Sequence, residues 1–260
     1  MKTTLLFLSF FLSVSLFGQN VYIPDANFKA YLVGNPEINT NGDTEIQVSE
    51  AIAFDGIINC GYENIADLTG IEAFTALTQL FCQSNQLTSL DVSQNTALTD
   101  ILCADNYITS LDVSNNYALI NLSCQLNQLE NLNVSQNYVL NFLDCQSNQL
   151  TSLDVSQNTF LLGLYIDNNQ LTSLDISQNT SMTVLACSYN EITCLNMVNG
   201  NNINMNFVSY GNPNLNCVQV DNAVWSTANW ASVDPQIFFS ENCDYPSDCF
   251  ATSLTELTTS

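Results

Sequence analysis

Residues 77–95 read L-T-Q-L-F-C-Q-S-N-Q-L-T-S-L-D-V-S-Q-N, and this stretch decides the fold. Its pattern, L-x-x-L-x-C-x-x-N-x-L-x-x-L-D-V-S-x-N, recurs every 21 residues. Later copies begin at Leu98, Leu119, Leu140, Leu161 and Met182. A degenerate copy precedes this stretch, and a shifted copy follows at residues 210–220. Repetition of this length predicts an array in which each copy is one structural unit that packs against its neighbours.

The apolar spacing predicts a strand near the start of each copy. In Leu80-Phe81-Cys82, alternation points Leu80 and Cys82 to one face and Phe81 to the other. One such strand cannot bury its apolar side, but parallel copies stacked about 4.8 Å apart build a continuous core. We expect the asparagine of each copy to form an internal ladder, because an amide can satisfy backbone groups where the chain leaves the strand. The ladder comprises Asn85, Asn106, Asn127, Asn148, Asn169 and Asn190.

This repeat resembles the leucine-rich-repeat family, whose core motif L-x-x-L-x-L-x-x-N-x-L allows Cys at the third apolar place. The resemblance covers about residues 57–220. It implies an α/β fold, a right-handed leucine-rich-repeat solenoid with one parallel β-sheet on its concave face. A small helical N-terminal cap and a disulfide-containing C-terminal cap would close the ends. The predicted organisation is a signal peptide (1–19), the N-terminal cap (20–56), the repeats (57–204), the last repeat with the C-terminal cap (205–249) and a disordered tail (250–260).

Six cysteines share the inward place of the predicted strands. They are Cys60, Cys82, Cys103, Cys124, Cys145 and Cys187, and Ile166 takes this place in one further copy. That exchange indicates a small or medium apolar group, which a free thiol supplies. Side chains in register on parallel strands point the same way, which suits the torsion of a disulfide badly. We therefore predict buried thiols. A metal ladder is the alternative, although C-x₂-C spacing is absent.

Four more cysteines, Cys194, Cys217, Cys243 and Cys249, lie at or beyond the end of the repeats. In an exported protein they predict a cap held by disulfides. The segment from Asn212 to Asp221, with residues 239–243, resembles the terminal segment of Bacteroidetes-type repeat proteins. This resemblance implies a bridge between Cys217 and Cys243. Whether Cys194 pairs with Cys249 stays open.

A different composition precedes the repeats. Pro24-Asp25-Ala26 predicts the start of a short helix with Phe28, Tyr31 and Leu32 on one face. Residues 39–50 then resemble the calcium loop of EF-hands, which a bidentate glutamate closes. The resemblance implies as ligands Asn39, Asn41, Asp43, the Glu45 carbonyl and Glu50.

Two departures weaken this calcium loop. Asn39 replaces the usual Asp, and Thr44 stands where the loop needs Gly for its turn. Internalin-like repeat proteins also carry EF-hand-like caps that need no metal. We expect a cap that requires no cofactor, with a structural calcium ion as the alternative.

Charge and composition exclude several functions. The chain has 2 Lys+Arg, 25 Asp+Glu and no His. A basic surface for phosphates is therefore absent, which excludes nucleic-acid binding, and histidine-based catalysis and zinc ligation are impossible. The repeat accounts for nearly every polar residue, and no Gly-rich phosphate loop or G-x-S-x-G stands outside it. We predict that the chain is not an enzyme.

Both ends indicate export. An apolar run from Leu5 to Phe17 follows Lys2 and ends at Gly18-Gln19, as in a Sec-type signal peptide, and it is too short for a membrane span. Residues 250–260 resemble the start of the sorting domain of Bacteroidetes type IX secretion, which would make the chain a fragment. We expect a secreted or cell-surface protein with no transmembrane segment.

The outward strand places vary between copies, whereas the inward places hardly vary. Exposed aromatic and aliphatic groups there indicate contact sites. The candidate protein-binding patch is Phe81, Leu102, Phe142, Tyr165 and Tyr189. Drift on an uncommitted surface is the alternative.

A second polar row carries mostly aspartates: Asp91, Asp112, Asn133, Asp154, Asp175 and Asn196. We expect these side chains to brace the turn that follows each of them, with weak binding of divalent ions as the alternative.

Taken together, these patterns predict an exported, monomeric module that binds a protein or glycan through its concave face. The alternative is a non-catalytic structural spacer or the accessory region of a larger secreted protein.

Overall fold

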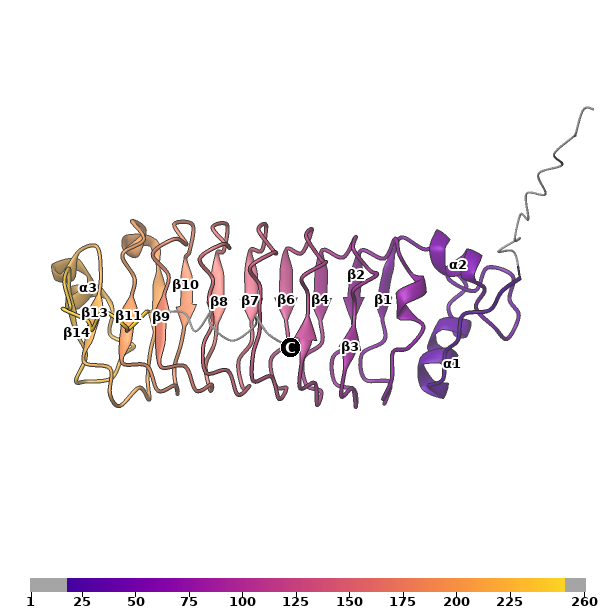
Figure 1. Cartoon of the computed structure of the whole chain (residues 1–260), viewed down its shortest axis with the longest axis horizontal. Helices are drawn as coiled ribbons and strands as arrows, with labels where there is room; N and C mark the ends of the chain where they lie inside the picture. The colour runs from indigo at the N-terminus through magenta and orange to yellow at the C-terminus, as the bar shows by residue number, and fades with distance from the viewer. Residues whose placement is uncertain (1–17, 251–260) are drawn as a thin grey trace, which may run out of the picture.

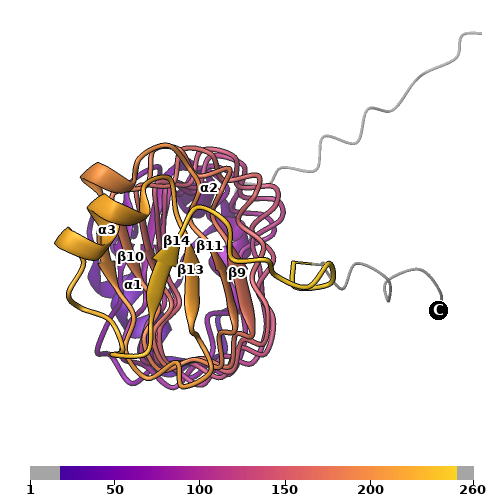
Figure 2. The same ribbon diagram turned by 90° about the vertical axis from the view of Figure 1, so that its left-hand side faces the viewer.

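Residues 18–250, which the computed structural model describes, fold into a rod of stacked coils (Figure 1). Viewed from the C-terminal end, successive coils superpose (Figure 2). One continuous core of buried apolar side chains runs along the rod from Val21 to Trp230. None of the helices described is long and apolar enough to cross a membrane. The predicted signal peptide and tail lie almost entirely outside the described residues.

Eight parallel strands form the main sheet, in the order β1-β2-β4-β6-β7-β8-β10-β12. They are β1 (Ile57–Asn59), β2 (Gln79–Phe81), β4 (Asp100–Leu102), β6 (Asn121–Ser123), β7 (Phe142–Asp144), β8 (Gly163–Tyr165), β10 (Val184–Ala186) and β12 (Asn206–Val208). Leu80 pairs with Ile101 and Ile101 with Leu122, so equivalent residues of successive copies lie side by side. The middle residue of each strand is buried. The predicted solenoid with a parallel sheet is confirmed.

Other parts of the coils form two further parallel sheets, whereas the sequence predicted a single sheet. One pairs β3 (Leu90–Asp91) with β5 (Leu111–Asp112). The other has the order β14-β13-β11-β9 and comprises β9 (Ser173–Asp175), β11 (Cys194–Asn196), β13 (Cys217–Gln219) and β14 (Phe238–Ser240). The reason is that the second apolar segment of each copy is extended too. Stacking of the coils brings neighbouring copies of that segment within pairing distance.

The predicted asparagine ladder is present, and Asn127 shows how it works. Its Nδ2 donates to the carbonyl oxygens of Cys103 (3.0 Å) and Cys124 (3.1 Å), on two successive coils. Its Oδ1 accepts the N–H of Ile108 at 2.9 Å. Asn85, Asn106, Asn148, Asn169 and Asn190 repeat this pattern. Each amide therefore ties one coil to the next where the strand ends.

A second buried ladder stands at another corner of the coil. Asn137 is fully buried, and its Nδ2 donates to the carbonyl oxygens of Val113 (3.0 Å) and Asn116 (2.9 Å) of the preceding coil. Asn95, Asn116, Asn158 and Asn179 make equivalent contacts. The sequence repeat contained this asparagine, but its role as a link between coils was not predicted.

The aspartate row braces turns, as expected. The Oδ1 atoms of Asp91 and Asp112 accept the N–H of Ser93 and Ser114, each at 2.9 Å. These hydrogen bonds lower the pKa of both carboxyls, since they stabilise the charged form. The other members of the row, Asn133, Asp154, Asp175 and Asn196, brace their turns with the same hydrogen bond, each accepting the N–H of the residue two places on.

The six inward cysteines are buried free thiols, as predicted. Burial raises the pKa of Cys60, Cys103 and Cys187 to about 12, because a thiolate would lie in an apolar core. These thiols therefore stay protonated at neutral pH and act as small apolar groups.

The N-terminal cap holds α1 (Ala26–Gly34) and α2 (Val48–Ala53), followed by the 3₁₀ turn η1 (Ile71–Ala73). Asp25 caps α1, because its side chain accepts the N–H groups of Asn27 and Phe28. Phe28 and Leu32 are fully buried. The predicted helix is confirmed, and it covers the first coil of the solenoid.

The C-terminal cap contains η2 (Asn202–Asn204), α3 (Ala223–Asn229) and β14. Buried Trp230 donates from its indole nitrogen to the Met205 carbonyl (3.0 Å), and its ring packs edge-on against Phe207. Disulfides join Cys217 to Cys243 and Cys194 to Cys249, with Cα–Cα distances of 5.8 and 6.1 Å. The implied Cys217 bridge is confirmed, and the open pairing is settled.

We predict that Asn127→Ala lowers the free energy of unfolding by about 3 kcal/mol. The substitution leaves the buried N–H of Ile108 without a partner and removes one of the two amide hydrogen bonds that each of the Cys103 and Cys124 carbonyls accepts. Urea denaturation measures the change. Exposed Asn115 is the matched control, and Asn115→Ala should cost less than about 0.5 kcal/mol. Equal effects of both substitutions would show that the ladder does not link the coils energetically.

Candidate binding surface

The N-terminal loop that resembles a calcium loop is closed by its own hydrogen bonds. Glu50 accepts the N–H groups of Thr40 (2.8 Å), Asn41 (3.2 Å) and Gln47 (3.0 Å) and the hydroxyl of Thr40 (3.0 Å). Burial raises the pKa of the Glu50 carboxyl, but these hydrogen bonds outweigh burial, so the pKa lies below its ordinary value. Both carboxylate oxygens already face donors, where a calcium ion would need them as ligands.

The side chains of Asn39, Asn41 and Asp43 also make hydrogen bonds within the loop region. The amide of Asn39 donates to the carbonyls of Val33 and Asp43, and its oxygen accepts the N–H of Gly42. Asn41 donates to Asp43, whose Oδ1 in turn accepts the N–H of Glu45. The Glu45 side chain pairs with Lys29 at 2.6 Å. Within residues 18–250, no three His, Cys, Asp or Glu side chains are grouped to hold a metal. In this arrangement the side-chain oxygens of the loop accept protein hydrogen bonds.

The five residues of the predicted protein-binding patch lie on or beside the main sheet and point away from the core. Phe81 and Leu102 are paired in register on β2 and β4 and are half-buried. Phe142 on β7 is 43% exposed, and Tyr189, just beyond β10, is 60% exposed. Tyr165 on β8 is half-buried. Ser123 on β6 separates Phe81 and Leu102 from Phe142, Tyr165 and Tyr189, so the patch has two parts.

A glycine lets two rings of this patch converge. Gly163 pairs in register with Phe142, and a Cβ atom at Gly163 would lie 2.9 Å from the Phe142 ring and 3.2 Å from the Tyr165 ring. Gly163 is buried although its strand position points outward. The two rings therefore cover the glycine and form an apolar platform, which a side chain at position 163 would displace.

One row of residues beside the sheet has left-handed backbone geometry. It comprises Ser84, Asp105, Leu126, Ser147, Asn168 and Tyr189, with φ between 54° and 56°. Polar residues with short side chains tolerate this geometry, whereas a bulky residue pays about 1 kcal/mol or more. Leu126 and Tyr189 are the exceptions in this row, and Tyr62 holds the same place in the first coil; all three are strongly exposed, at 54%, 60% and 73%. Strain combined with exposed apolar surface is a mark of functional positions.

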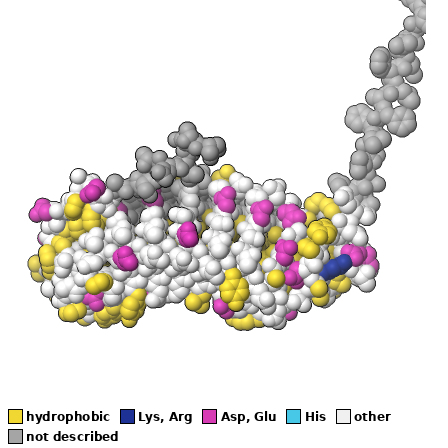
Figure 3. Space-filling view, turned by 60° about the horizontal axis from the view of Figure 1, so that its bottom comes forward, with side chains coloured by type: hydrophobic (Ala, Val, Ile, Leu, Met, Phe, Trp, Pro, Cys, Tyr) yellow, Lys and Arg dark blue, Asp and Glu magenta, His cyan; other side chains and the backbone are white. Residues whose placement is uncertain are grey.

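The main-sheet face also carries carboxylates. Asp100 lies on β4, Asp144 on β7, and Asp167 follows β8. Lys29 is the one cationic side chain among residues 18–250, and it pairs with Glu45 in the N-terminal cap. Figure 3 shows acidic side chains spread along the rod and the lysine at its N-terminal end. The face is therefore apolar and acidic.

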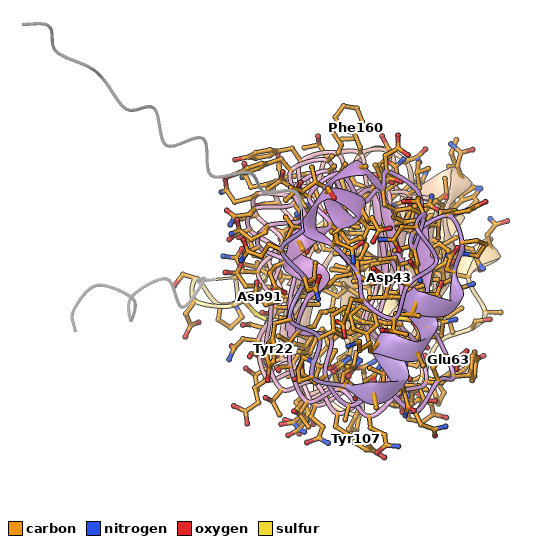
Figure 4. All side chains as sticks on the ribbon, turned by 90° about the vertical axis from the view of Figure 1, so that its right-hand side faces the viewer. Tyr22, Asp43, Glu63, Asp91, Tyr107 and Phe160 are labelled. Carbon is orange, nitrogen blue, oxygen red and sulfur yellow. A yellow bond between two sulfur atoms is a disulfide. The ribbon has the colours of Figure 1, made fainter. Side chains whose placement is uncertain are left out.

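A second exposed apolar cluster was not predicted. Tyr117, Tyr138, Val139 and Phe160 are 56%, 46%, 42% and 59% exposed and lie on successive coils. The signal was available, because Tyr117 and Tyr138 occupy the place that holds Thr96 in an earlier copy. Figure 4 shows Phe160 on the opposite side of the rod from Tyr107. We call these four residues the ridge cluster.

The repeat, the stacked parallel strands and the asparagine ladders define the leucine-rich-repeat fold. The chain is similar to a solved structure of the functional domain of InlJ from Listeria monocytogenes, described as including a cysteine ladder. The sequences are 32% identical, the TM-score is 0.58, and the match covers 78% of this chain and 52% of that one.

Sequence comparison gives the same neighbour. Internalin J of Listeria monocytogenes serotype 4b (strain F2365) is 40% identical over 76 residues, which are 29% of this chain and 8% of the relative. Internalin C2 from strain 4b F2365 matches at 18% identity with a TM-score of 0.51, over 72% of this chain and 93% of that one, which supports the fold alone. No protein-family model matches the chain. The chain spans about half of the InlJ structure and a small part of internalin J.

We predict that calcium does not change the melting temperature, because the loop oxygens already accept protein hydrogen bonds. The measurement is thermal unfolding with added calcium and with a chelator. A bound ion would raise the melting temperature by mass action. As a control, Glu50→Gln should lower the free energy of unfolding by about 2 kcal/mol in both conditions. Stabilisation by calcium in the native protein and not in Glu50→Gln would contradict the prediction.

Proposed function

We propose that this chain is an exported, non-catalytic module that binds a protein through the outward face of its main sheet. The observation that carries the proposal is that some residues on this face lower the stability of the fold. Leu126 and Tyr189, like Tyr62 in the first coil, occupy a left-handed position that Ser, Asp, Asn or Gly fills in the other coils, and they expose their side chains. Such residues lower stability, so their presence is best explained by a contact that needs them.

The surroundings support a binding role. Phe142 and Tyr165 lie over Gly163 on the same face, and aromatic residues are favoured anchors in protein interfaces. The neighbouring solved structure is described as a functional domain, and it too has the solenoid and a cysteine ladder. Two disulfides in the C-terminal cap are consistent with an oxidising location outside the cytosol. We extend the proposal to a secreted or cell-surface location and a monomeric state.

The competing function is a structural spacer or the accessory region of a larger protein. It is favoured by one observation, the small share of internalin J that the chain matches. A spacer requires stacked coils but places no demand on the outward residues. The two functions therefore differ in what substitutions on the sheet face do.

We predict that a triple variant, Phe142→Asp, Tyr165→Asp and Tyr189→Asp, loses a partner that residues 20–260 capture from surface extracts. The substitutions put charge on the apolar platform, while the inward positions are unchanged. The matched control is Tyr117→Asp, Tyr138→Asp and Phe160→Asp on the ridge cluster, with the same change in charge. Circular dichroism shows whether each variant folds.

A further variant separates function from stability. Leu126→Asn should raise the free energy of unfolding by about 0.5 to 1 kcal/mol, because Asn tolerates left-handed geometry, and should weaken capture. If the ridge variant alone loses the partner, the binding surface is the ridge cluster and not the sheet face. If no bait captures a partner, the spacer function is favoured.

A further inference from the structure

One part of the sheet face combines rings and carboxylates. We define the β7–β8 patch as Phe142, Asp144, Gly163, Tyr165 and Asp167. Phe142 pairs with Gly163 and Asp144 with Tyr165, and all four lie on the outward side of neighbouring strands. Asp167 follows Tyr165 by two residues, and its Oδ1 accepts the N–H of Ser188 at 2.8 Å. The platform of two rings therefore borders two carboxyl groups.

The carboxyl groups of Asp144 and Asp167 repel each other when both are charged. Asp144 is half-buried, and its Oδ1 accepts the N–H of Gln146 at 3.2 Å. Burial raises the pKa of Asp144, the hydrogen bonds from Gln146 act against this, and the charge of Asp167 adds to the rise. A half-buried anion beside a like charge is costly, and a cation placed between them would relieve that cost.

The part of the chain that the structure describes supplies no such cation. Lys29 belongs to α1 and its Nζ contacts Glu45, at the far N-terminal end of the rod. The sequence contains 2 Lys+Arg against 25 Asp+Glu. A complementary charge must therefore come from a partner, and the excess of negative charge over the whole chain would attract one.

The geometry selects the kind of cation. An aromatic face attracts a guanidinium or ammonium group within about 6 Å of its centre, a contact worth about 0.5 to 2 kcal/mol depending on exposure. A guanidinium also donates to carboxylates while its plane lies on a ring. A bare metal ion would use the carboxylates but not the rings. The combination of rings and carboxylates therefore fits a side chain with a long apolar stem and a charged head.

We propose that the β7–β8 patch receives an arginine or lysine side chain from a basic segment of a partner protein, with its stem on Phe142 and Tyr165 and its charge at Asp144 and Asp167. This inference rests on the proposed function, since it names the chemistry of the partner at the same face. The charge of the partner segment is then opposite to that of the chain, and arginine is the better fit.

The probe is a fluorescent hexa-arginine peptide, and its binding to the native chain is measured by anisotropy, with a hexa-glutamate peptide as the negative probe. Asp144→Asn with Asp167→Asn should weaken binding about tenfold, since both charges that face the guanidinium are removed. Asp91→Asn with Asp112→Asn is the matched control. It also removes two carboxylates from adjacent coils, and Asn133 already fills the same place in a third coil. The control should bind within about twofold of the native chain.

A third variant tests the rings without changing charge. Phe142→Leu with Tyr165→Leu keeps the apolar surface and should weaken binding several-fold. If both double aspartate variants bind the peptide equally weakly, the attraction depends only on the overall charge of the chain, and the inference is overturned. The inference is also overturned if the native chain does not bind the peptide. Either result leaves the proposed function standing if the captured partner still depends on Phe142, Tyr165 and Tyr189. A captured glycan, or a partner with an acidic contact segment, would also overturn it.

Discussion

The buried asparagine amide is the interaction on which the rest of the structure depends. Where each strand ends, the chain turns while still inside the core, and its carbonyl and N–H groups have no strand partner. An unpaired buried backbone group costs about 1 to 3 kcal/mol. Asn127 meets this demand on two coils at once, through the carbonyls of Cys103 and Cys124 and the N–H of Ile108. The second ladder, with Asn137, satisfies two carbonyls of the preceding coil at another corner. Substitution at these places would break the link to the next coil, which explains why they do not vary between copies.

The same constraint leaves the outward places free. An inward side chain must match the coils on both sides, as the uniform row of cysteines and Ile166 shows. An outward side chain on the main sheet meets solvent, so its identity has little effect on stacking. Departures from what stability favours are therefore informative on this face. The bulky residues at the left-handed position and the glycine beneath two rings are such departures.

Much of the fold follows from residue spacing. The alternation around Leu80 predicts the strands, the recurring asparagines predict a ladder, and the inward cysteines predict thiols, because each conclusion depends on one position in a repeat. Other features depend on contacts between copies or on backbone geometry. The strand at Leu90–Asp91 forms because stacking supplies its partner, and the platform at Gly163 forms because two neighbouring rings lean over it. The closed loop at Glu50 depends on which N–H groups reach its carboxylate, and residue types alone do not specify this. The sequence predicted that the sheet-face residues point outward, but it did not predict the division at Ser123 or the ridge cluster.

The most direct test of the account is hydroxyl-radical footprinting of the complex with its partner, read by mass spectrometry at individual aromatic side chains. The exposed rings of the sheet face and of the ridge cluster are measured together, within one molecule and without any substitution. The account predicts that oxidation of Phe142, Tyr165 and Tyr189 falls in the complex while oxidation of Tyr117, Tyr138 and Phe160 is unchanged. Protection of the ridge cluster, with the sheet face still oxidised, would contradict it.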